Sequence, residues 1–385
     1  MNKYSIYEPA EDSYLIKKHI KHYAKNQVLE IGTGSGILAL EAAKYAKKVT
    51  AVDIQKEVIK HCKKTIKNDK ITFKQSNLFQ NIKQSFDLII FNPPYLPDDP
   101  RIKDIALDGG KKGYELTEQF LNNANLHLKE DGKILLLFSS LTKQNKINEI
   151  IENNLLNYEQ IDQLNLPFEI LYVYIIEKSN LLKQLEKNKL TNPKKFSRGR
   201  RGLIYKAVYK NKEVIIKSKN PRSKALSTIE FEANWLKKLN KHKIGPKLLL
   251  KTKEFIVMEY IEGDLFTEYI ENNKKLNILK LIKNIMNQLD TLDKLGINKQ
   301  EMTHPYKHII IRNHKPVLID FERSKHTEKP RNITQFIQHL TSKNISSLLN
   351  NKNIILNKEK MQNLAKIYKN QRSKELYKEI IDAIK

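Results

Sequence analysis

The segment FDLIIFNPPYLP at residues 86–97 breaks a run of apolar residues with an amide, two prolines and an aromatic ring. Because proline fixes its own backbone angle and restricts the residue before it, Pro93 and Pro94 should hold the Asn92 amide in one orientation. A planar NH2 group could then donate its protons to the Asn92 oxygen and the Pro93 carbonyl, with its plane against the Tyr95 ring. These residue types predict a site for a glutamine amide or an amino base.

An NH2 group held in this way keeps its nitrogen directed toward an incoming electrophile. Transfer of a methyl group from a sulfonium needs such in-line positioning more than it needs an acid or a base. The alternative is a proline-rich turn without chemistry. Polar residues at neighbouring strand ends favour the first interpretation, so we expect Asn92, Pro93 and Tyr95 to act in catalysis.

A glycine-rich turn, EIGTGSG at residues 30–36, joins an apolar run to an amphipathic one. Ile37 stands where a dinucleotide-binding fingerprint would have its third glycine, which disfavours a nicotinamide cofactor. Asp53 ends the next apolar run, where a carboxylate could accept hydrogen bonds from both hydroxyls of a ribose. Asn77 follows the third run, where its side chain could read an adenine amino group. An ordinary turn, a helix N-cap and a loop residue are the alternatives, but together these positions favour a nucleoside pocket.

The elements that position these residues alternate in type. Five short apolar runs have the composition of buried strands, at residues 27–31, 48–53, 71–73, 87–91 and 133–138. Amphipathic runs at residues 37–46 and 55–67 have helical spacing. This alternation predicts a doubly wound, Rossmann-like α/β domain, in which ligands bind beyond the carboxyl ends of the strands. Two further runs, at residues 158–164 and 169–177, predict antiparallel strands at one edge.

These features resemble the class I S-adenosylmethionine-dependent methyltransferases, and within them the HemK-like branch that methylates protein glutamine. The similarity covers about residues 4–178. It includes YEPAEDS at residues 7–13, typical of archaeal and eukaryotic members, and LDGG at residues 107–110 followed by Gly113. The resemblance implies S-adenosylmethionine as cofactor, bound by Glu30, Gly32, Gly34, Gly36, Asp53 and Asn77. Relatives usually have Asp at position 77, so the adenine contact departs from the family pattern.

The resemblance also implies a substrate and a partner. Family members methylate the glutamine of a GGQ motif in peptide-chain release factors, and archaeal and eukaryotic members commonly work with a small zinc-binding activator subunit. NPPY also occurs in methyltransferases that act on the amino group of adenine in DNA or RNA, and this alternative stays open. Residues 1–180 hold 25 Lys and Arg against 23 Asp and Glu. That near-neutral charge favours a protein substrate, because a nucleic-acid site normally needs a basic surface.

The second half has a different order of elements. A strand, a glycine turn and further strands lead to a helix, and the segment VLIDFE follows at residues 317–322. These features resemble the small lobe, hinge and metal-binding segment of protein kinases, closest to the RIO-like and Bud32-like kinases, over about residues 190–345. By this resemblance Gly199 and Gly202 would cover the phosphates of ATP and Lys217 would contact them. Glu232, or alternatively Glu230, would pair with Lys217.

The expected catalytic segment departs from the kinase pattern. Asp320 would bind Mg²⁺, but in place of an Asp and an Asn five residues apart this chain has Glu301 and His308, seven apart. Glu301 could accept a hydroxyl proton. His308 could serve as a metal ligand, although imidazole suits Mg²⁺ less well than oxygen does. A serine/threonine kinase, an ATP-binding module and a pseudokinase scaffold therefore stay open.

Charge is unevenly placed along the 385 residues. The net charge is +27, and residues 181–385 hold 45 Lys and Arg against 20 Asp and Glu. This excess predicts contact with a polyanion such as RNA or the ribosome, with a solvated lysine-rich surface as the alternative. We expect a methyltransferase domain at residues 1–180, an α+β kinase-like domain at residues 181–345 and a basic helical extension at residues 346–385.

The number of cysteines and the length of the apolar runs indicate the cellular compartment of the protein. Cys62 is the single cysteine, which excludes a disulfide or a thiolate metal cluster within this chain and favours the reducing cytoplasm. No apolar run reaches the roughly 18 residues that a membrane span needs. We therefore expect a cytoplasmic protein without membrane contact.

Overall fold

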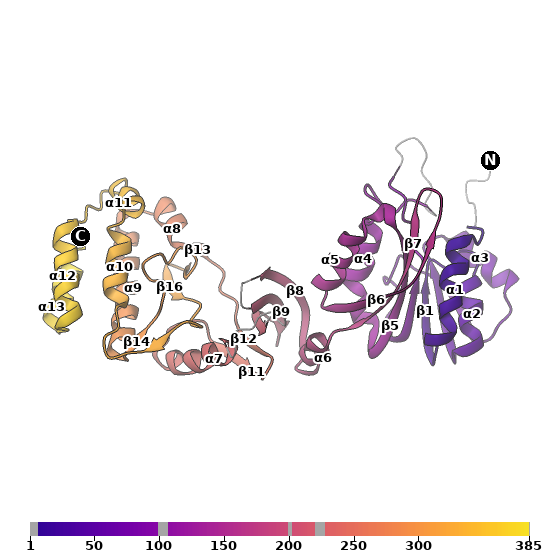
Figure 1. Cartoon of the computed structure of the whole chain (residues 1–385), viewed down its shortest axis with the longest axis horizontal. Helices are drawn as coiled ribbons and strands as arrows, with labels where there is room; N and C mark the ends of the chain where they lie inside the picture. The colour runs from indigo at the N-terminus through magenta and orange to yellow at the C-terminus, as the bar shows by residue number, and fades with distance from the viewer. Residues whose placement is uncertain (1–6, 99–106, 199–201, 220–227, 385) are drawn as a thin grey trace. The chain divides into compact units, whose positions relative to one another are not determined.

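The computed structural model describes residues 7–98, 107–198, 202–219 and 228–384. The chain forms two compact units, Met1–Lys194 and Lys195–Lys385, and each is described by itself (Figure 1). Gly199, which we expected in a phosphate-binding turn, lies outside the described residues. Within those residues, no helix is both long enough and apolar enough to cross a membrane.

The first unit is built on a seven-stranded mixed sheet with the order β3-β2-β1-β4-β5-β7-β6. Strands β1 to β5 run parallel, whereas β7 is antiparallel to both of its neighbours. The strand order reverses between β1 and β4, the place where doubly wound sheets bind ligands. The strands are β1 (Gln27–Ile31), β2 (Lys48–Asp53), β3 (Ile71–Gln75), β4 (Phe86–Phe91), β5 (Leu128–Ser139), β6 (Leu156–Asn165) and β7 (Ile170–Lys178).

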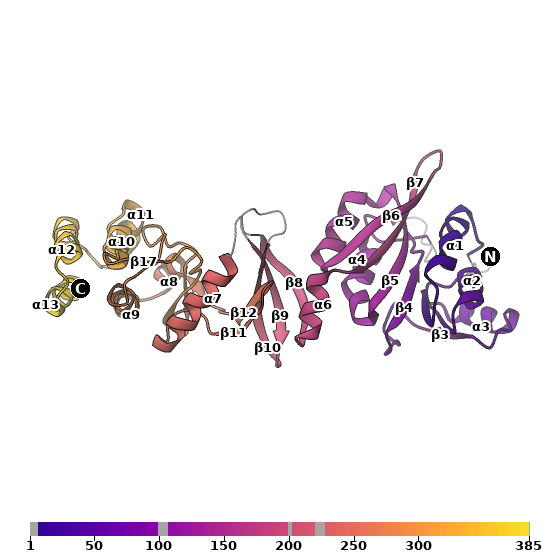
Figure 2. The same cartoon turned by 60° about the horizontal axis from the view of Figure 1, so that its bottom comes forward.

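Helices cover both faces of this sheet (Figures 1 and 2). On one face, α1 (Glu11–Tyr23), α2 (Ile37–Tyr45) and α3 (Lys56–Thr65) share a buried apolar cluster with the strands. On the other lie α4 (Glu115–Ala124) and α5 (Gln144–Asn153), where Phe120 of α4 packs on Phe91 of β4 with ring centroids 4.4 Å apart. This double cover explains why β1, β2 and β4 are almost entirely buried.

The expected strands of the first half match the structure closely. β1 and β2 have the predicted bounds, β3 extends to Gln75 and β5 begins earlier, at Leu128. The antiparallel pair predicted at one edge is confirmed as β6 and β7. The first unit therefore has the Rossmann-like layers that the alternation predicted.

The first unit extends past the boundary that we expected at residue 180. Lys178 at the end of β7 donates to Glu186 of α6 (Asn180–Lys187) at 2.8 Å, and Lys183 of α6 donates to Asp131 within β5 at 2.7 Å. These ion pairs tie α6 to the sheet of the first unit. The division into units consequently falls at Lys194.

A five-stranded sheet of the order β11-β12-β10-β9-β8 follows, in which β8 spans the division at Lys194 and the other four strands belong to the second unit. Its central strands β9, β10 and β12 pair antiparallel, and α7 (Thr228–Leu239) packs Ala233 and Leu236 into the same buried cluster as Ile256 of β12. The strands are β8 (Leu190–Arg198), β9 (Gly202–Tyr209), β10 (Lys212–Lys219), β11 (Leu248–Lys251) and β12 (Phe255–Glu259).

The rest of the second unit is mostly helical, with two small antiparallel sheets. One buried apolar cluster runs from α7 to Ile384 and includes Ile380 of the last helix, so the predicted C-terminal extension packs into the same core. The elements are β13 (Asp264–Leu265), α8 (Phe266–Asn272), α9 (Lys275–Lys294), β14 (Ile297–Asn298), β15 (Ile309–Arg312), β16 (Lys315–Leu318), β17 (Lys325–His326), α10 (Asn332–Leu340), α11 (Lys343–Asn350), α12 (Lys358–Asn370) and α13 (Lys374–Asp382).

Candidate functional site

A cavity of about 850 Å³ lies at the carboxyl ends of the parallel strands in the first unit. The structure brings the predicted residues together there because those strand ends meet at one edge of the sheet. Its lining includes Glu30, Gly32, Gly34, Asp53, Asn77, Asn92, Pro93 and Tyr95. Gly36 is not in the lining and instead precedes the first residue of α2.

Backbone conformation explains two of the predicted glycines. Gly32 and Gly36 have φ angles of 68° and 79°, in the left-handed region that favours glycine. No described atom lies within 4 Å of the place that a Cβ on Gly32 would occupy, so the backbone there is open to a ligand. A Cβ on Gly36 would lie 2.5 Å from Cδ1 of Ile66. Gly32 thus leaves the cavity open, and Gly36 allows α2 and the segment after α3 to pack closely.

Glu30 and Asp53 are buried carboxylates in the cavity wall. Burial raises the pKa of Glu30 to about 8. The hydrogen bond that Glu30 accepts from the Thr33 hydroxyl at 2.5 Å lowers the pKa but does not outweigh burial. Asp53 accepts hydrogen bonds from the N–H groups of Gly34 and Gln55 at 3.2 and 2.9 Å, while burial raises its pKa. A bound cation would favour the charged form of both groups. The pair therefore suits a ligand that carries positive charge and hydroxyl groups.

Asn77 follows β3 at the solvent side of the cavity. Its side chain is exposed and contributes to the lining. Its backbone carbonyl accepts a hydrogen bond from the Gln80 N–H at 3.0 Å, which fixes the turn. The side chain can thus reach a ligand from the open side.

Asn92 is held by a carboxylate whose role the sequence patterns did not reveal. The Asn92 side-chain nitrogen donates to Asp12 at 2.7 Å, and Asp12 is itself fixed by the Tyr7 hydroxyl at 2.8 Å and the Ser13 N–H at 2.6 Å. Because an ionised carboxylate only accepts hydrogen bonds, this contact sets the orientation of the Asn92 amide. Asn92 Oδ1 is then buried, with no hydrogen-bond partner among the described residues. Such an acceptor requires a donor from a ligand.

Pro93 and Tyr95 stand beside Asn92 in the cavity wall. Burial, followed by the charges of Glu169 and Asp12, raises the pKa of the Tyr95 hydroxyl, which therefore stays neutral at physiological pH. The neutral ring offers a flat apolar surface. Sequence reasoning missed both Asp12 and Glu169. Asp12 lies in the YEPAEDS segment, whereas no motif marked Glu169.

The cavity wall is strongly acidic. None of its lining residues, within the described part of the chain, is Lys, Arg or His. A wall of this kind attracts a cation and repels a polyanion. The carboxylates of the lining are Asp12, Glu30, Asp53, Asp98, Asp108, Glu115, Glu118 and Glu169.

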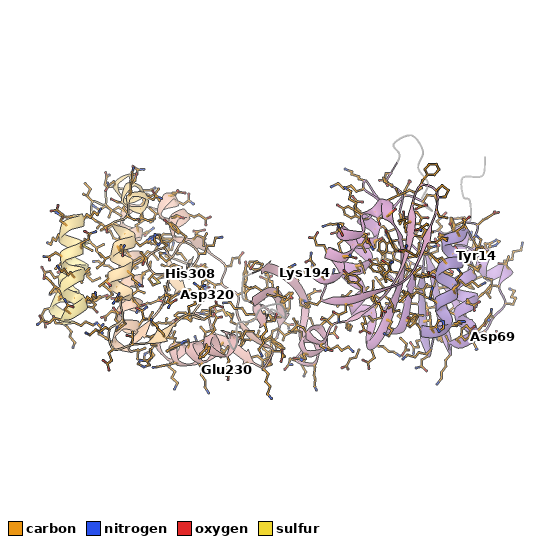
Figure 3. All side chains as sticks on the ribbon, viewed as in Figure 1. Tyr14, Asp69, Lys194, Glu230, His308 and Asp320 are labelled. Atoms are coloured by element: carbon orange, nitrogen blue, oxygen red, sulfur yellow. The ribbon has the colours of Figure 1, made fainter. Side chains whose placement is uncertain are left out.

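In the second unit, Lys217 of β10 lies between two carboxylates. Its Nζ is 2.7 Å from Glu232 of α7 and 3.2 Å from Asp320, which follows β16. Burial opposes the charge on Lys217, but the two carboxylates outweigh it and raise the pKa. Glu230, the alternative partner, lies instead 3.4 Å from Lys251 and is exposed (Figure 3). Tertiary structure thus selects Glu232 as the partner of Lys217.

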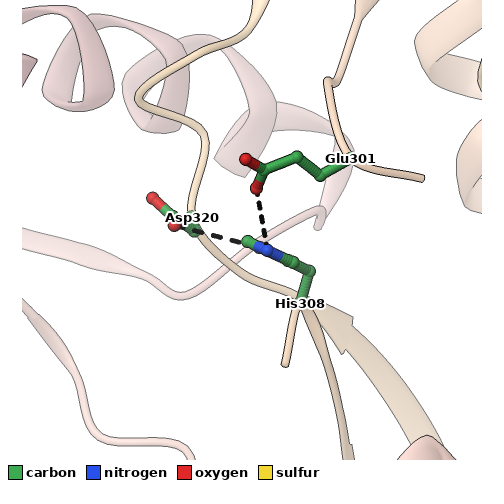
Figure 4. Close-up of side chains that lie close together, drawn as sticks. All are labelled: Glu301, His308 and Asp320. Atoms are coloured by element: carbon green, nitrogen blue, oxygen red, sulfur yellow. Dashed lines mark ion pairs between the residues drawn. The ribbon is translucent and has the colours of Figure 1, made fainter. Parts of the chain in front are cut away.

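Glu301 and His308 converge on Asp320 in spite of their unusual spacing (Figure 4). His308 Nε2 lies 2.8 Å from Glu301, and His308 Nδ1 lies 3.8 Å from Asp320. One ligand atom from each of the three residues lies within 4.8 Å of the others, close enough to share a metal ion. Arg323 also donates to Glu301, at 2.5 Å. Glu301 is therefore engaged by two partners rather than free to act as a base.

Lys299 is a buried residue that the sequence analysis did not single out. Its Nζ donates to the backbone carbonyl of Asp320 at 2.8 Å and lies 5.1 Å from the centre of the Phe321 ring. Burial lowers the pKa of Lys299 to about 8. In a chain with 70 Lys and Arg, nothing local distinguished it from a solvated lysine. Asp320 is consequently held through both its side chain and its backbone.

Gly202 opens β9, where a Cβ would lie 3.1 Å from the carbonyl oxygen of Ser218 on β10. This close approach accounts for glycine at that position. Because Gly199 lies outside the described residues, the phosphate-binding turn stays a prediction.

Residues 4–171 match the family model described as the methyltransferase small domain. Over 176 residues the chain is 39% identical to the "Putative protein N5-glutamine methyltransferase" of Methanocaldococcus jannaschii, a match that covers 44% of this chain and 89% of that protein. The chain belongs to this methyltransferase family. Membership implies S-adenosylmethionine as the methyl donor.

Two further proteins are similar to this chain. The release factor glutamine methyltransferase of Streptococcus pneumoniae is 33% identical over 123 residues, which cover 28% of this chain and 44% of that enzyme. The chain thus spans less than half the length of that relative. The chain is also similar to the solved structure of the E. cuniculi Mtq2-Trm112 complex, which is responsible for the methylation of the eRF1 translation termination factor. The identity is 23% and the TM-score is 0.39, and the match covers 45% of this chain and 98% of that one. The family match ends at residue 171, so it leaves the second unit unassigned.

Proposed function

We propose that the first unit methylates the side-chain nitrogen of a glutamine in a protein, with S-adenosylmethionine as the methyl donor. The observation that carries this proposal is the buried, unpartnered Oδ1 of Asn92. A glutamine amide supplies the N–H donor that this oxygen requires. Because Asp12 engages the Asn92 nitrogen, the side chain presents its oxygen rather than its NH2 to a substrate.

Three residues hold the substrate in this proposal. Asn92 Oδ1 and the Pro93 carbonyl accept the two protons of the glutamine amide, and the Tyr95 ring supports its plane. The nitrogen is then directed along one line, and orientation of this kind accounts for much of the rate of a methyl transfer. These roles are the ones that NPPY predicted from the restricted geometry of two consecutive prolines.

The residues around the glycine turn fit the methyl donor. Bound S-adenosylmethionine supplies an electrophilic methyl group on a positively charged sulfur. The buried carboxylate of Glu30 and the open backbone at Gly32 suit its charged methionine end. Asp53 suits the ribose hydroxyls, and Asn77 reaches the position proposed for the adenine. Gly34 and Gly36 shape the glycine-rich turn between β1 and α2.

The substrate that we propose is the glutamine of a GGQ motif in a peptide-chain release factor. Support comes from the family match and from a 33% identical relative named as a release factor glutamine methyltransferase. We also propose a small zinc-binding activator subunit as partner, because the YEPAEDS segment resembles archaeal and eukaryotic members that use one.

A labelling assay tests both the substrate and the site. The full chain is incubated with S-adenosylmethionine carrying a labelled methyl group, a release factor and RNA, with and without the activator subunit. We expect label on the GGQ glutamine, identified by mass spectrometry, from the wild type and not from Asn92→Ala. Label on RNA with an unmodified glutamine would overturn the proposed substrate.

A nucleic-acid amino-methyltransferase is the second candidate for the first unit. An adenine amino group presents the same two N–H donors as a glutamine amide, so Asn92 alone does not separate the two. The acidic wall favours the protein substrate, because a wall rich in carboxylates and without Lys, Arg or His among its described residues would repel the phosphates that accompany a base. The basic second half could still deliver RNA, and the RNA arm of the assay covers this outcome.

We propose that the second unit binds ATP with a divalent metal ion and has a kinase-like arrangement. The supporting observation is the convergence of Lys217, Glu232 and Asp320 from three separate elements. Asp320 and His308 would share the metal, with Glu301 beside them. Since imidazole suits Mn²⁺ better than Mg²⁺, we expect Mn²⁺ to support binding at least as well.

Calorimetry of the full chain with ATP and either metal tests this proposal. Binding should be lost in Asp320→Ala and weakened in Lys217→Met. The rival function is a scaffold that docks RNA or a protein without a nucleotide. Absence of ATP binding with both metals would leave only the scaffold, and transfer of the γ-phosphate to a protein would identify a kinase.

A further inference from the structure

Glu169 stands in the same cavity as Asn92 and is the last residue of the turn that joins β6 and β7. The turn is well defined, because the Leu166 N–H donates to the Glu169 carbonyl at 2.8 Å and Asn165 pairs with Ile170. The Ile170 N–H is also fixed by the Ser140 hydroxyl at 3.0 Å. The backbone around Glu169 is therefore held from both sides.

The Glu169 side chain is partly buried, and one of its two carboxylate oxygens lacks a hydrogen-bond partner within the described residues. Its Oε2 is buried and makes no hydrogen bond within the described residues. The lining of the cavity that the structure describes holds no Lys, Arg or His to neutralise it. Glu169 and Tyr95, whose ring is proposed to support the substrate amide, line the same cavity, and the charge of Glu169 contributes to the raised pKa of the Tyr95 hydroxyl. A buried acceptor of this kind is costly unless a ligand supplies a donor.

We propose that Glu169 binds the methyl-acceptor polypeptide by accepting a hydrogen bond from one of its backbone N–H groups. This inference rests on the proposed glutamine methylation. Asn92 and the Pro93 carbonyl take both protons of the side-chain amide, so the donors left near the base of the glutamine side chain are those of the peptide backbone. The substrate is thereby held at two points, the amide by Asn92 and the main chain by Glu169.

This second contact gives the site selectivity for a polypeptide. A peptide main chain offers N–H donors at every residue except proline. A nucleic acid offers phosphates next to the base, and these are repelled by a carboxylate in the cavity wall. Asn92 can bind a glutamine amide or an adenine amino group equally well, and Glu169 therefore provides the preference for the polypeptide.

The test compares Glu169→Ala with Glu159→Ala, an exposed acid on β6 of the same hairpin. The substrates are a GGQ peptide and a set of peptides in which one backbone N–H at a time, at or beside the glutamine, is replaced by an ester oxygen. In Glu169→Ala we expect KM for the GGQ peptide to rise roughly 10- to 100-fold, while KM for S-adenosylmethionine changes less than about twofold. With the wild type, one ester peptide should show the same rise in KM relative to the unmodified GGQ peptide. With Glu169→Ala, this ester peptide and the unmodified peptide should have the same KM.

The melting temperature distinguishes a role of Glu169 in substrate binding from a role in holding the fold together. Removing a partly buried carboxylate with one unpartnered oxygen should leave the melting temperature of the ligand-free chain unchanged or higher, whereas loss of a structural partner would lower it. An unchanged peptide KM in Glu169→Ala, or ester losses that are equal in both enzymes, would overturn the inference while glutamine methylation stands. If the wild type leaves the GGQ glutamine unmodified, it is the proposed function that fails.

Discussion

The two candidate sites differ in how their charged side chains are paired. In the first unit, Asn92 Oδ1 and Glu169 Oε2 are buried in the described structure without hydrogen-bond partners, and both lie in the wall of one cavity. In the second unit, Lys217 already contacts Glu232 and Asp320, and Glu301 already contacts His308 and Arg323. The first site thus has two buried acceptors without donors, whereas the charged side chains of the second site are paired and one ring nitrogen, His308 Nδ1, lacks a hydrogen-bond partner within the described residues.

This difference predicts different behaviour toward ligands. An unpartnered acceptor gains a hydrogen bond when a substrate arrives, so substrate binding in the first unit breaks no existing hydrogen bond of these two oxygens. A ligand of the second unit has to replace ion pairs that are already made. Residues of the first site should accordingly matter most for activity, and residues of the second for stability.

The largest effect is expected for Asn92→Ala. Loss of the oxygen that orients the substrate amide should lower the rate of methyl transfer by about 100- to 1000-fold, as loss of one preorganised polar group does in other active sites. Binding of S-adenosylmethionine should be retained, measured by calorimetry on the same preparation. A variant that keeps more than about a tenth of the wild-type rate would show that the two sites do not differ as proposed.

The next effect concerns the stability of the second unit. Glu232→Ala leaves the buried Lys217 with Asp320 as its remaining carboxylate partner in the described structure and should destabilise the unit by about 3 kcal/mol. Trp235, the one tryptophan of the chain, lies on the same helix, so its fluorescence reports the unfolding of this unit.

The matched control is Glu230→Ala on the same helix. Glu230 is exposed and pairs with Lys251 at 3.4 Å, so its loss should change stability by less than about 0.5 kcal/mol. Equal effects of the two variants would mean that the Lys217 pair is not the buried contact described here.

A smaller effect is expected for Asp12→Ala. Without its carboxylate the Asn92 amide can rotate and present either its oxygen or its NH2, so the methylation rate should fall roughly tenfold. Glu11→Ala, the neighbouring exposed acid, serves as the control and should keep near wild-type activity. A similar loss in both variants would point to damage at the start of α1 rather than to the Asn92 contact.

The last prediction concerns the pH dependence of stability from Glu30. Its pKa is raised by burial from 4.5 to about 8, so the folded state binds more protons than the unfolded state between these values. The contribution of Glu30 to the free energy of unfolding must therefore fall as pH rises through this window, by at most about 1.4 kcal/mol per pH unit.

Urea unfolding followed by circular dichroism measures this slope in the chain without cofactor, with the transition of the second unit assigned from Trp235 fluorescence. The variant Glu30→Gln should have a flatter profile between about pH 5 and pH 8. Identical slopes in the two proteins would place the titrating group elsewhere.

Much of the first unit could be predicted because its signals are local. Buried parallel strands are short continuous apolar runs, so β1 and β2 have the bounds that composition indicated. The end of the first unit could not be predicted in this way. It depends on Lys178 and Lys183, which look like solvated residues until α6 folds against the sheet.

By itself, the sequence determined which residues stand at the strand ends, since strand periodicity and the restrictions of proline and glycine act over a few residues. Only tertiary structure decided which polar groups meet. It selected Glu232 over Glu230 as the partner of Lys217. It also brought Asp12 into contact with Asn92, 80 residues away in the sequence, and Lys299 into contact with the backbone carbonyl of Asp320. The physical reason is that a hydrogen bond or ion pair depends on distance in space and on burial, and neither is encoded in the spacing of residues along the chain.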